Sequence, residues 1–264
     1  MTQEPAGPGG ITLISRACVL LRVVSNHEPH GASTAELARD AGLARPTAHR
    51  VLTGLAAEGF LARDDATGRW FLGPELFLLG AVASSRYDIR SIALPVVRRL
   101  ADLTEESAFF SVVQGDDIVC LIREDGAFPI RSHVLHEGSR FPLGVVAGGI
   151  AVLAFRSDDE IREFLAGHDF TEAYGAAHDV ASIEDRIADA RRQGWSHNPG
   201  LIVSGSWGMA APVFDPADRP IGSLSLTGIE ARFGPERRPE LGATLLKAAH
   251  SLTRSLRDRE SRRG

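Results

Sequence analysis

The chain has 264 residues, 44% of them hydrophobic and 24% charged, with a formal net charge of −5. This length has room for a small domain of about 80 residues and a larger one of about 170. The net charge excludes a general attraction to nucleic acid. The sequence has no apolar run near the roughly 18 residues of a membrane-spanning helix, and its polar first ten residues lack a signal-peptide pattern. We therefore expect a cytoplasmic, two-domain protein.

Residues 11–25 are expected to form the first helix. Its apolar stripe holds Ile14, Cys18, Leu21 and Val24. The other cysteine, Cys120, lies in the strand-like run IVCLI. Two distant cysteines cannot form a disulfide framework or a zinc site by themselves, so we expect both side chains to lie in the core rather than to act as nucleophiles.

The segment STAELARDAG carries the signals of a helix followed by a tight turn. Ser33 and Glu36 are spaced as in a capping box, in which each residue satisfies a backbone N–H of the other. Gly42 supplies the backbone freedom that a sharp turn between two helices needs. This arrangement is typical of the first half of a helix-turn-helix.

The second helix is expected to start near Pro46, because a proline's missing N–H needs no partner in the first helical turn. Val51, Leu52 and Leu55 share one face at helical spacing. The outward residues are then Thr47, Ala48, Arg50 and part of His49. Residues 41–57 hold two arginines, one histidine and no acid, although residues 1–85 carry seven arginines against eight acids. The basic character is thus local and not domain-wide, which departs from the strongly basic domain usual in DNA-binding proteins.

Two short strands at 60–63 and 69–72 follow, and they complete a winged helix-turn-helix. Gly68 turns the wing, and Arg69 at its tip can enter a minor groove or bind phosphate. The alternative is a helical hairpin whose charges are merely solvated, which the agreement of turn, proline and wing disfavours. The candidate DNA contacts are Arg45, Thr47, His49, Arg50 and Arg69.

A rigid helical linker with Pro95 near its middle is expected next, before a domain of antiparallel strands with helices packed outside. The expected strands are a hairpin around Gln114–Asp117, a strand at 130–135, and strands within 195–214 and 220–228. The expected helices are one that follows a glycine pair within 142–154, and those at 158–166, 183–193 and 235–258. We thus divide the chain into a tail at 1–10, a winged helix-turn-helix at 11–74, a linker at 75–105 and an α+β domain at 106–264.

Five segments, in this order, resemble the isocitrate-lyase-regulator (IclR) family of bacterial transcription regulators. They are ELARDAGLARPTAHRVLTGLAAEGFL, GRWFLGP, PLGVVAGGIAVLA, GWSHNPGLIVSGSWGMAAPVFD and IGSLSLTG. The resemblance implies a regulator that binds a double-stranded DNA operator and carries a C-terminal effector domain similar to GAF and PAS sensors. It also implies dimers or tetramers, a small organic or aromatic carboxylate as effector, no cofactor and no enzyme activity.

The resemblance also implies a ligand site. Its members here are Ala147, Gly148, Asn198, Gly208, Ser225 and Thr227, with His133, Phe141 and Ser206 as walls. Free N–H groups at a helix start can bind a carboxylate. Ser225 and Thr227, two residues apart on one strand, face the same side and can add hydrogen bonds.

The chain departs from the family pattern at four places. Asn198 stands where the family usually has Asp, and Gly200-Leu201 where it has Glu-Glu. Ile150 replaces a common Lys and Gly144 replaces a His, so we expect a roomier, less basic pocket. Asn can donate as well as accept a hydrogen bond, which suits a different or more anionic ligand.

Other interpretations stay open. Ser225 and Thr227 can be ordinary strand residues satisfied by backbone. His133 and His136, three apart on a strand, would point to opposite faces, which disfavours a metal site. The chain can also be a DNA-bound scaffold without a small ligand. An enzyme is disfavoured because the sequence lacks a nucleophile elbow, a phosphate loop, an HExxH pair and a His beside Cys120.

Overall fold

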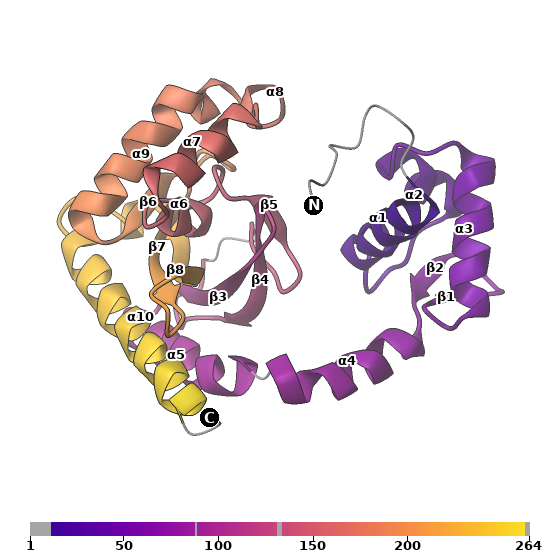
Figure 1. Ribbon diagram of the computed structural model, residues 1–264, viewed down its shortest axis with the longest axis horizontal. Helices are drawn as coiled ribbons and strands as arrows, with labels where there is room; N and C mark the ends of the chain where they lie inside the picture. Colours follow the sequence, from indigo (N-terminus) through magenta and orange to yellow (C-terminus); the bar gives the residue numbers. More distant parts are fainter. Residues whose placement is uncertain (1–11, 88, 131–133, 262–264) are drawn as a thin grey trace, which may run out of the picture. The chain divides into compact units, whose positions relative to one another are not determined.

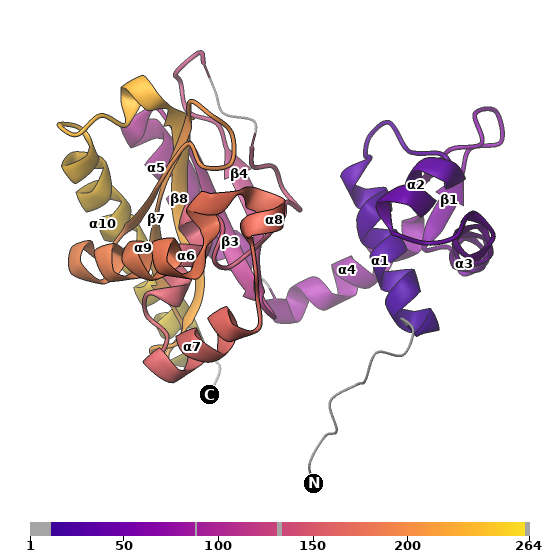
Figure 2. The same ribbon diagram turned by 90° about the horizontal axis from the view of Figure 1, so that it is seen from above.

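The computed structural model describes residues 12–87, 89–130 and 134–261 (Figures 1 and 2). The chain divides into two compact units between Tyr87 and Asp88. The expected tail at 1–10 lies outside the described residues. Within the described ranges, no helix is both long and apolar enough to cross a bilayer.

The N-terminal unit contains the predicted winged helix-turn-helix. Its helices pack around a core that includes Leu20, Leu37, Leu52 and Trp70. A two-stranded antiparallel wing follows the third helix. The elements are α1 (Leu13–Asn26), α2 (Thr34–Asp40), α3 (Arg45–Ala57), β1 (Leu61–Arg63), β2 (Trp70–Leu72) and α4 (Pro74–Tyr87).

The local signals of the helix-turn-helix are confirmed. The Ser33 N–H donates to Glu36 Oε2 at 2.8 Å and the Glu36 N–H donates to Ser33 Oγ at 3.3 Å, which completes the capping box. Gly42 has a φ of +63°, in the left-handed region that the turn requires. Pro46 lies in the first turn of α3.

The prediction for the face of α1 was wrong in part. Of the expected stripe, Val24 is buried and Leu21 packs against the core, whereas Cys18 is exposed and Ile14 is 76% exposed. Leu20, four residues before Val24, faces the core in their place. Cys120, by contrast, is buried as expected.

The C-terminal unit is built on a six-stranded antiparallel sheet in the order β5-β4-β3-β8-β7-β6. The hairpin predicted at Gln114–Asp117 joins β3 to β4. The strands are β3 (Ser107–Gln114), β4 (Asp117–Glu124), β5 (Arg140–Pro142), β6 (Ser196–Pro199), β7 (Ser206–Phe214) and β8 (Pro220–Ile229).

Helices cover both faces of this sheet (Figure 1). On one face lie α5 (Ile89–Thr104) and α10 (Arg238–Ser261), so α5, expected in the linker, is part of this unit's core. On the other face lie α6 (Ala147–Leu153), α7 (Asp158–Ala166) and α9 (Val180–Gln193). The short elements are α8 (Thr171–Tyr174), η1 (Ala176–His178) and η2 (Glu230–Arg232).

Several predicted boundaries were wrong. The glycine pair Gly148-Gly149 lies inside α6 rather than before it, because both glycines let the helix pack closely: a Cβ on Gly149 would meet the Leu143 carbonyl oxygen at 2.1 Å. The strand expected at 130–135 is not formed by its described residues, and 131–133 lie outside them. The strands expected within 195–214 are found, as β6 and β7 joined by a loop, whereas α9 starts three residues earlier than expected.

The two sides of β8 differ sharply in chemistry. Leu224 and Leu226 face α5 and α10 and belong to the larger apolar core. Ser223, Ser225 and Thr227 alternate with them and therefore face α6. The sheet thus presents an apolar face to one helical layer and a hydroxyl-bearing face to the other.

Candidate DNA-reading surface and ligand cavity

The first turns of α3 form the basic surface of the N-terminal unit. Arg45, His49 and Arg50 are exposed, and Thr47 is half-buried. Ala48 was expected to face outward, and this was wrong: it is fully buried against Val51 and Leu52 in the core. Its small side chain serves packing of the helix rather than approach to a groove.

Sequence reasoning missed Thr53. It is exposed and lies one helical turn after His49, on the same face of α3. Continuing the spacing of the outward residues by one more helical turn would have predicted it. The outward surface of α3 therefore runs from Arg45 to Thr53.

The two wing arginines turn back toward their own unit. The Arg69 guanidinium donates to the Gly31 carbonyl oxygen at 2.8 Å and lies 4.0 Å from Glu36. Arg63 lies over the Trp70 ring at 5.5 Å from its centroid and donates to the Gly68 carbonyl oxygen at 3.4 Å. Arg69 is thus bound to the body of the unit and does not project from the wing.

The wing turn is a compact, acidic loop. Asp64 accepts hydrogen bonds from the Ala66 N–H and the Thr67 hydroxyl, both at 2.8 Å. These two bonds hold the pKa of Asp64 below its usual value, so the carboxylate stays charged. Asp65 is exposed beside it.

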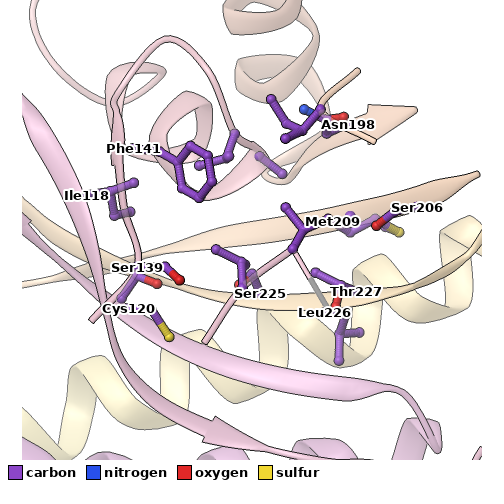
Figure 3. Close-up of a pocket in the computed structure, with 18 of the residues that line it drawn as sticks. Ile118, Cys120, Ser139, Phe141, Asn198, Ser206, Met209, Ser225, Leu226 and Thr227 are labelled. Atoms are coloured by element: carbon purple, nitrogen blue, oxygen red, sulfur yellow. The ribbon is translucent and has the colours of Figure 1, made fainter. Parts of the chain in front are cut away.

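A cavity lies in the C-terminal unit between the hydroxyl-bearing face of the sheet and α6 (Figure 3). All eight described residues of the expected ligand set line it, and they come from five elements: β5, α6, β6, β7 and β8. These residues are Phe141, Ala147, Gly148, Asn198, Ser206, Gly208, Ser225 and Thr227. The ninth, His133, lies outside the described residues.

Strand pairing adds residues to the sheet side of the cavity that the sequence analysis did not single out. Ser111 on β3 pairs with Ser223 on β8 and with Cys120 on β4. A bulge between Phe110 and Ser111 shifts the β4 register by one residue, which turns Cys120 to the cavity. Burial raises the pKa of the Cys120 thiol to about 12, so the thiol is neutral.

Two hydroxyls under α6 are buried without a partner among the described residues: Ser223 Oγ and Thr227 Oγ1. Thr227 is 7% exposed and lines the cavity. Ser223 lies beneath Gly148, where an added Cβ would come within 2.7 Å of its hydroxyl oxygen. A buried hydroxyl without a hydrogen bond is costly, by about 1–3 kcal/mol.

The N-terminus of α6 opens without a side-chain cap among the described residues. The first amides of any helix have no intrahelical acceptor, so the N–H groups of Ala147 and Gly148 are available at the cavity wall. Ser196, on β6, instead contacts this helix through the Ala147 carbonyl oxygen, to which its hydroxyl donates at 2.6 Å.

Asn198 ties the edge strand β6 to the segment that leads into α6. Its Nδ2 donates to the Val145 carbonyl oxygen at 3.2 Å, and its Oδ1 accepts from the Leu201 N–H at 2.9 Å. The buried ring of His178 also reaches the Val145 carbonyl oxygen, at 3.2 Å from Nε2. Both ends of the Asn198 amide are therefore hydrogen-bonded to backbone groups of the cavity wall, one of them the N–H of Leu201.

The expected effect of Gly144 and Ile150 on the cavity was wrong. Ile150 is buried in the apolar cluster with α7 and α9. A Cβ on Gly144 would meet Phe170 at 2.8 Å, so this glycine serves packing of the same cluster. Neither residue lines the cavity. The described part of the chain holds no group of three or more potential metal ligands.

A winged helix-turn-helix followed by an α+β unit is the architecture of a DNA-binding transcription regulator. Two family models match the chain: the IclR helix-turn-helix domain over residues 13–65 and the bacterial transcriptional regulator IclR C-terminal domain over residues 81–254. The chain belongs to the IclR family of transcriptional regulators.

Characterised relatives cover nearly the whole chain. The transcriptional repressor IclR of Escherichia coli is 26% identical over 93% of this chain and 90% of its own length. The glycerol operon regulatory protein of Streptomyces griseus is 29% identical over 93% and 96%. These relatives are named as regulators rather than enzymes.

Solved structures share the fold. An IclR-type regulator from Alicyclobacillus acidocaldarius superposes with a TM-score of 0.77 at 22% identity, covering 94% of this chain and 100% of the other. An IclR homologue from Microbacterium hydrocarbonoxydans, solved with 4-hydroxybenzoate, superposes with a TM-score of 0.74 at 23% identity and the same coverage.

The packing of Gly148 on Ser223 makes a stability prediction. Alanine normally stabilises a helix by about 1 kcal/mol relative to glycine, but Gly148→Ala should destabilise by about 1–3 kcal/mol because the new methyl meets the Ser223 hydroxyl. Ser223→Ala should be neutral or stabilising, since it removes an unpartnered hydroxyl. The double variant should recover at least about 1 kcal/mol of the loss.

Denaturant unfolding of the four proteins measures this cycle. Gly54→Ala on α3 is the control, because a Cβ there meets nothing within 4 Å and should not destabilise. Strictly additive losses in the double variant would contradict the described contact.

Proposed function

We propose that this regulator's affinity for its operator is controlled by a small organic or aromatic acid bound in the cavity between α6 and β8. The buried, unpartnered hydroxyl of Thr227 at that cavity carries the proposal. A polar group that is desolvated without a protein partner gains a hydrogen bond when a ligand supplies one. Ordinary strand residues satisfied by backbone would not leave this atom unpaired.

The wall chemistry fits one carboxylate on an apolar body. The N–H groups at the start of α6 and the hydroxyls of Ser225 and Thr227 are neutral donors. Of the described residues that line the cavity, none carries a charged side chain at neutral pH. Ile118, Phe141 and Met209 supply apolar surface for the rest of the molecule.

The size of the cavity makes binding depend on movement. Its volume, taken over the positions open to the centre of a water molecule, is about 40 Å³, which holds a few waters. An aromatic acid is larger, so its binding displaces wall segments. The loop that carries Ile202 is flanked by Gly200 and Gly205, which both have positive φ, and it is the wall segment best able to move. A ligand that binds only the opened wall shifts the population toward that state.

Support for the ligand class comes from one relative. The Microbacterium hydrocarbonoxydans homologue was solved with 4-hydroxybenzoate, an aromatic acid. The competing function is a DNA-bound scaffold without a small ligand. The small cavity and the engaged Asn198 amide favour that alternative, so the ligand test below must separate the two.

Recognition of DNA is proposed to require a dimer that reads a pseudo-palindrome through Arg45, Thr47, His49 and Arg50. One reading helix buries too little surface to specify a genomic site. Both α1 and α4 carry exposed apolar side chains suited to pairing two copies; Ile14 and Phe77 are 76% and 77% exposed. We assign the dimer contact to these helices.

Light scattering at micromolar concentration should give a dimer or a larger even-numbered assembly. Footprinting should show two half-sites separated by about one helical turn or a multiple of it. Phe77→Ser should shift the protein toward monomer and weaken binding to the full site more than to a half-site, whereas Thr53→Ser should leave the assembly unchanged. A wild-type monomer with a single asymmetric footprint would contradict the dimer.

For the ligand, a thermal-shift screen of aromatic and short aliphatic acids, 4-hydroxybenzoate included, should identify at least one that stabilises the protein. Calorimetry with that acid should then show Thr227→Val and Ser225→Ala weakening binding about tenfold or more, since a hydrogen bond to a charged group contributes about 1.5–3 kcal/mol. Ser255→Ala on α10, which packs on the sheet face opposite the cavity, is the matched control. If no acid binds, or if both cavity variants bind as the wild type does, the scaffold function replaces this one.

A further inference from the structure

Both arginines of the described wing make contacts within the N-terminal unit. Arg69 donates to the Gly31 carbonyl oxygen and lies near Glu36. Arg63 stacks on Trp70 and reaches the Gly68 carbonyl oxygen. An arginine that enters a minor groove must extend its guanidinium away from the protein. Arg69 is held against the body of its unit, and Arg63, although exposed, lies on the Trp70 ring and the Gly68 carbonyl oxygen of the wing itself.

The tip of the wing repels phosphate. Asp64 and Asp65 are adjacent at the turn, and Asp65 is exposed. The loop is closed by its own hydrogen bonds: the Gly68 N–H donates to the Asp64 carbonyl oxygen at 2.7 Å, and the Asp64 N–H donates to that of Arg69 at 2.9 Å. The backbone groups that could bind a phosphate are thus used within the turn.

The anchoring of β2 keeps this arrangement rigid. The N–H of Trp70 donates to the Ala32 carbonyl oxygen at 2.8 Å, and its indole Nε1 donates to Thr34 Oγ1 at 2.9 Å. Trp70 is 2% exposed. Moving Arg69 to DNA would break its hydrogen bond to the Gly31 carbonyl oxygen, a loss that a contact with DNA would have to exceed.

The arginines of α3, by contrast, are exposed and available to DNA. Arg45 and Arg50 are exposed, and neither takes part in an ion pair within the described ranges. They project from the first turns of the helix, the part of a recognition helix that contacts base edges. The preference of arginine for the O6 and N7 atoms of guanine makes guanine their expected partner in the major groove.

We propose that this chain reads its operator from the major groove alone, through α3, and that the wing makes no contact with the minor groove. This proposal rests on the proposed binding of a two-fold DNA site. The partner is a duplex whose half-sites contain guanine opposite Arg45 or Arg50. Its flanks, where a wing would lie, carry no requirement for A·T pairs.

The sequence preference of the operator is tested by selecting binding sites for the wild-type protein from a library of random DNA duplexes. Half-sites with guanine and flanks of random composition are expected. Replacing A·T by G·C pairs in the flanks should change the dissociation constant less than twofold. Flanks enriched in A·T, whose replacement weakens binding fivefold or more, would overturn the proposal. If no sequence is enriched at all, the proposed function itself fails.

A matched pair of variants tests the protein side. Arg50→Met should weaken binding to the selected site by a factor of about 5 to 150, the range for a lost base contact. Arg69→Met should stay within twofold of wild type at every salt concentration, with the same slope of log affinity against log salt. A slope smaller by about 0.9 or more for Arg69→Met would place Arg69 on a phosphate and overturn the proposal.

Circular dichroism and thermal unfolding accompany the variants, because Arg69→Met also removes a hydrogen bond to the helix-turn-helix body. Should Arg69→Met unfold, Arg63→Met and the flank replacement on wild-type protein decide the question with the same criteria.

Discussion

The antiparallel pairing of β3 with β8 is the constraint on which the structure of the C-terminal unit depends. Ser111 lies opposite Ser223, and Phe110 opposite Leu224. Since alternate residues face opposite sides, this register sends leucines to α5 and α10 and hydroxyls to α6. A shift of one residue would bury the serines under α10 and expose the leucines to the cavity. One register therefore sets both the stability of the unit and the chemistry of its cavity.

The hydroxyl-bearing face carries an energetic cost that the proposed ligand would reduce. Ser223 and Thr227 keep buried hydroxyl oxygens without partners among the described residues, and α6 begins beside them without a side-chain cap. Leucine or valine at Thr227 would pack with less penalty. Polar groups kept at such a cost, next to a wall loop with glycines at both ends, are what a site for a small polar ligand needs.

Sequence alone predicted the parts of the molecule that follow from short-range rules. The capping box of Ser33 and Glu36 depends only on neighbours in the chain, as does the placing of Ser225 and Thr227 on one face of a strand. Both are found in the structure. The face of α1 was mispredicted in part, because a stripe of Ile14, Cys18, Leu21 and Val24 is as plausible from the sequence as one centred on Leu20 and Val24. Only tertiary packing decides between two such stripes. Cys120 reaches the cavity through a β-bulge, which the sequence does not signal. Arg69 donates a hydrogen bond to the Gly31 carbonyl oxygen, 38 residues away, so the direction of its side chain could not be predicted from the sequence either.

The proposed control by a ligand requires that binding in the cavity of the C-terminal unit and binding of DNA by the N-terminal unit be thermodynamically coupled. The most direct test is to titrate the best-binding acid into the protein alone and into the protein saturated with operator. In parallel, operator affinity is measured with and without that acid. The account predicts that both dissociation constants change by the same factor, and a factor of about 5 to 150 is typical of allosteric coupling. An acid that binds equally well to free and operator-bound protein would contradict control of DNA binding by the cavity.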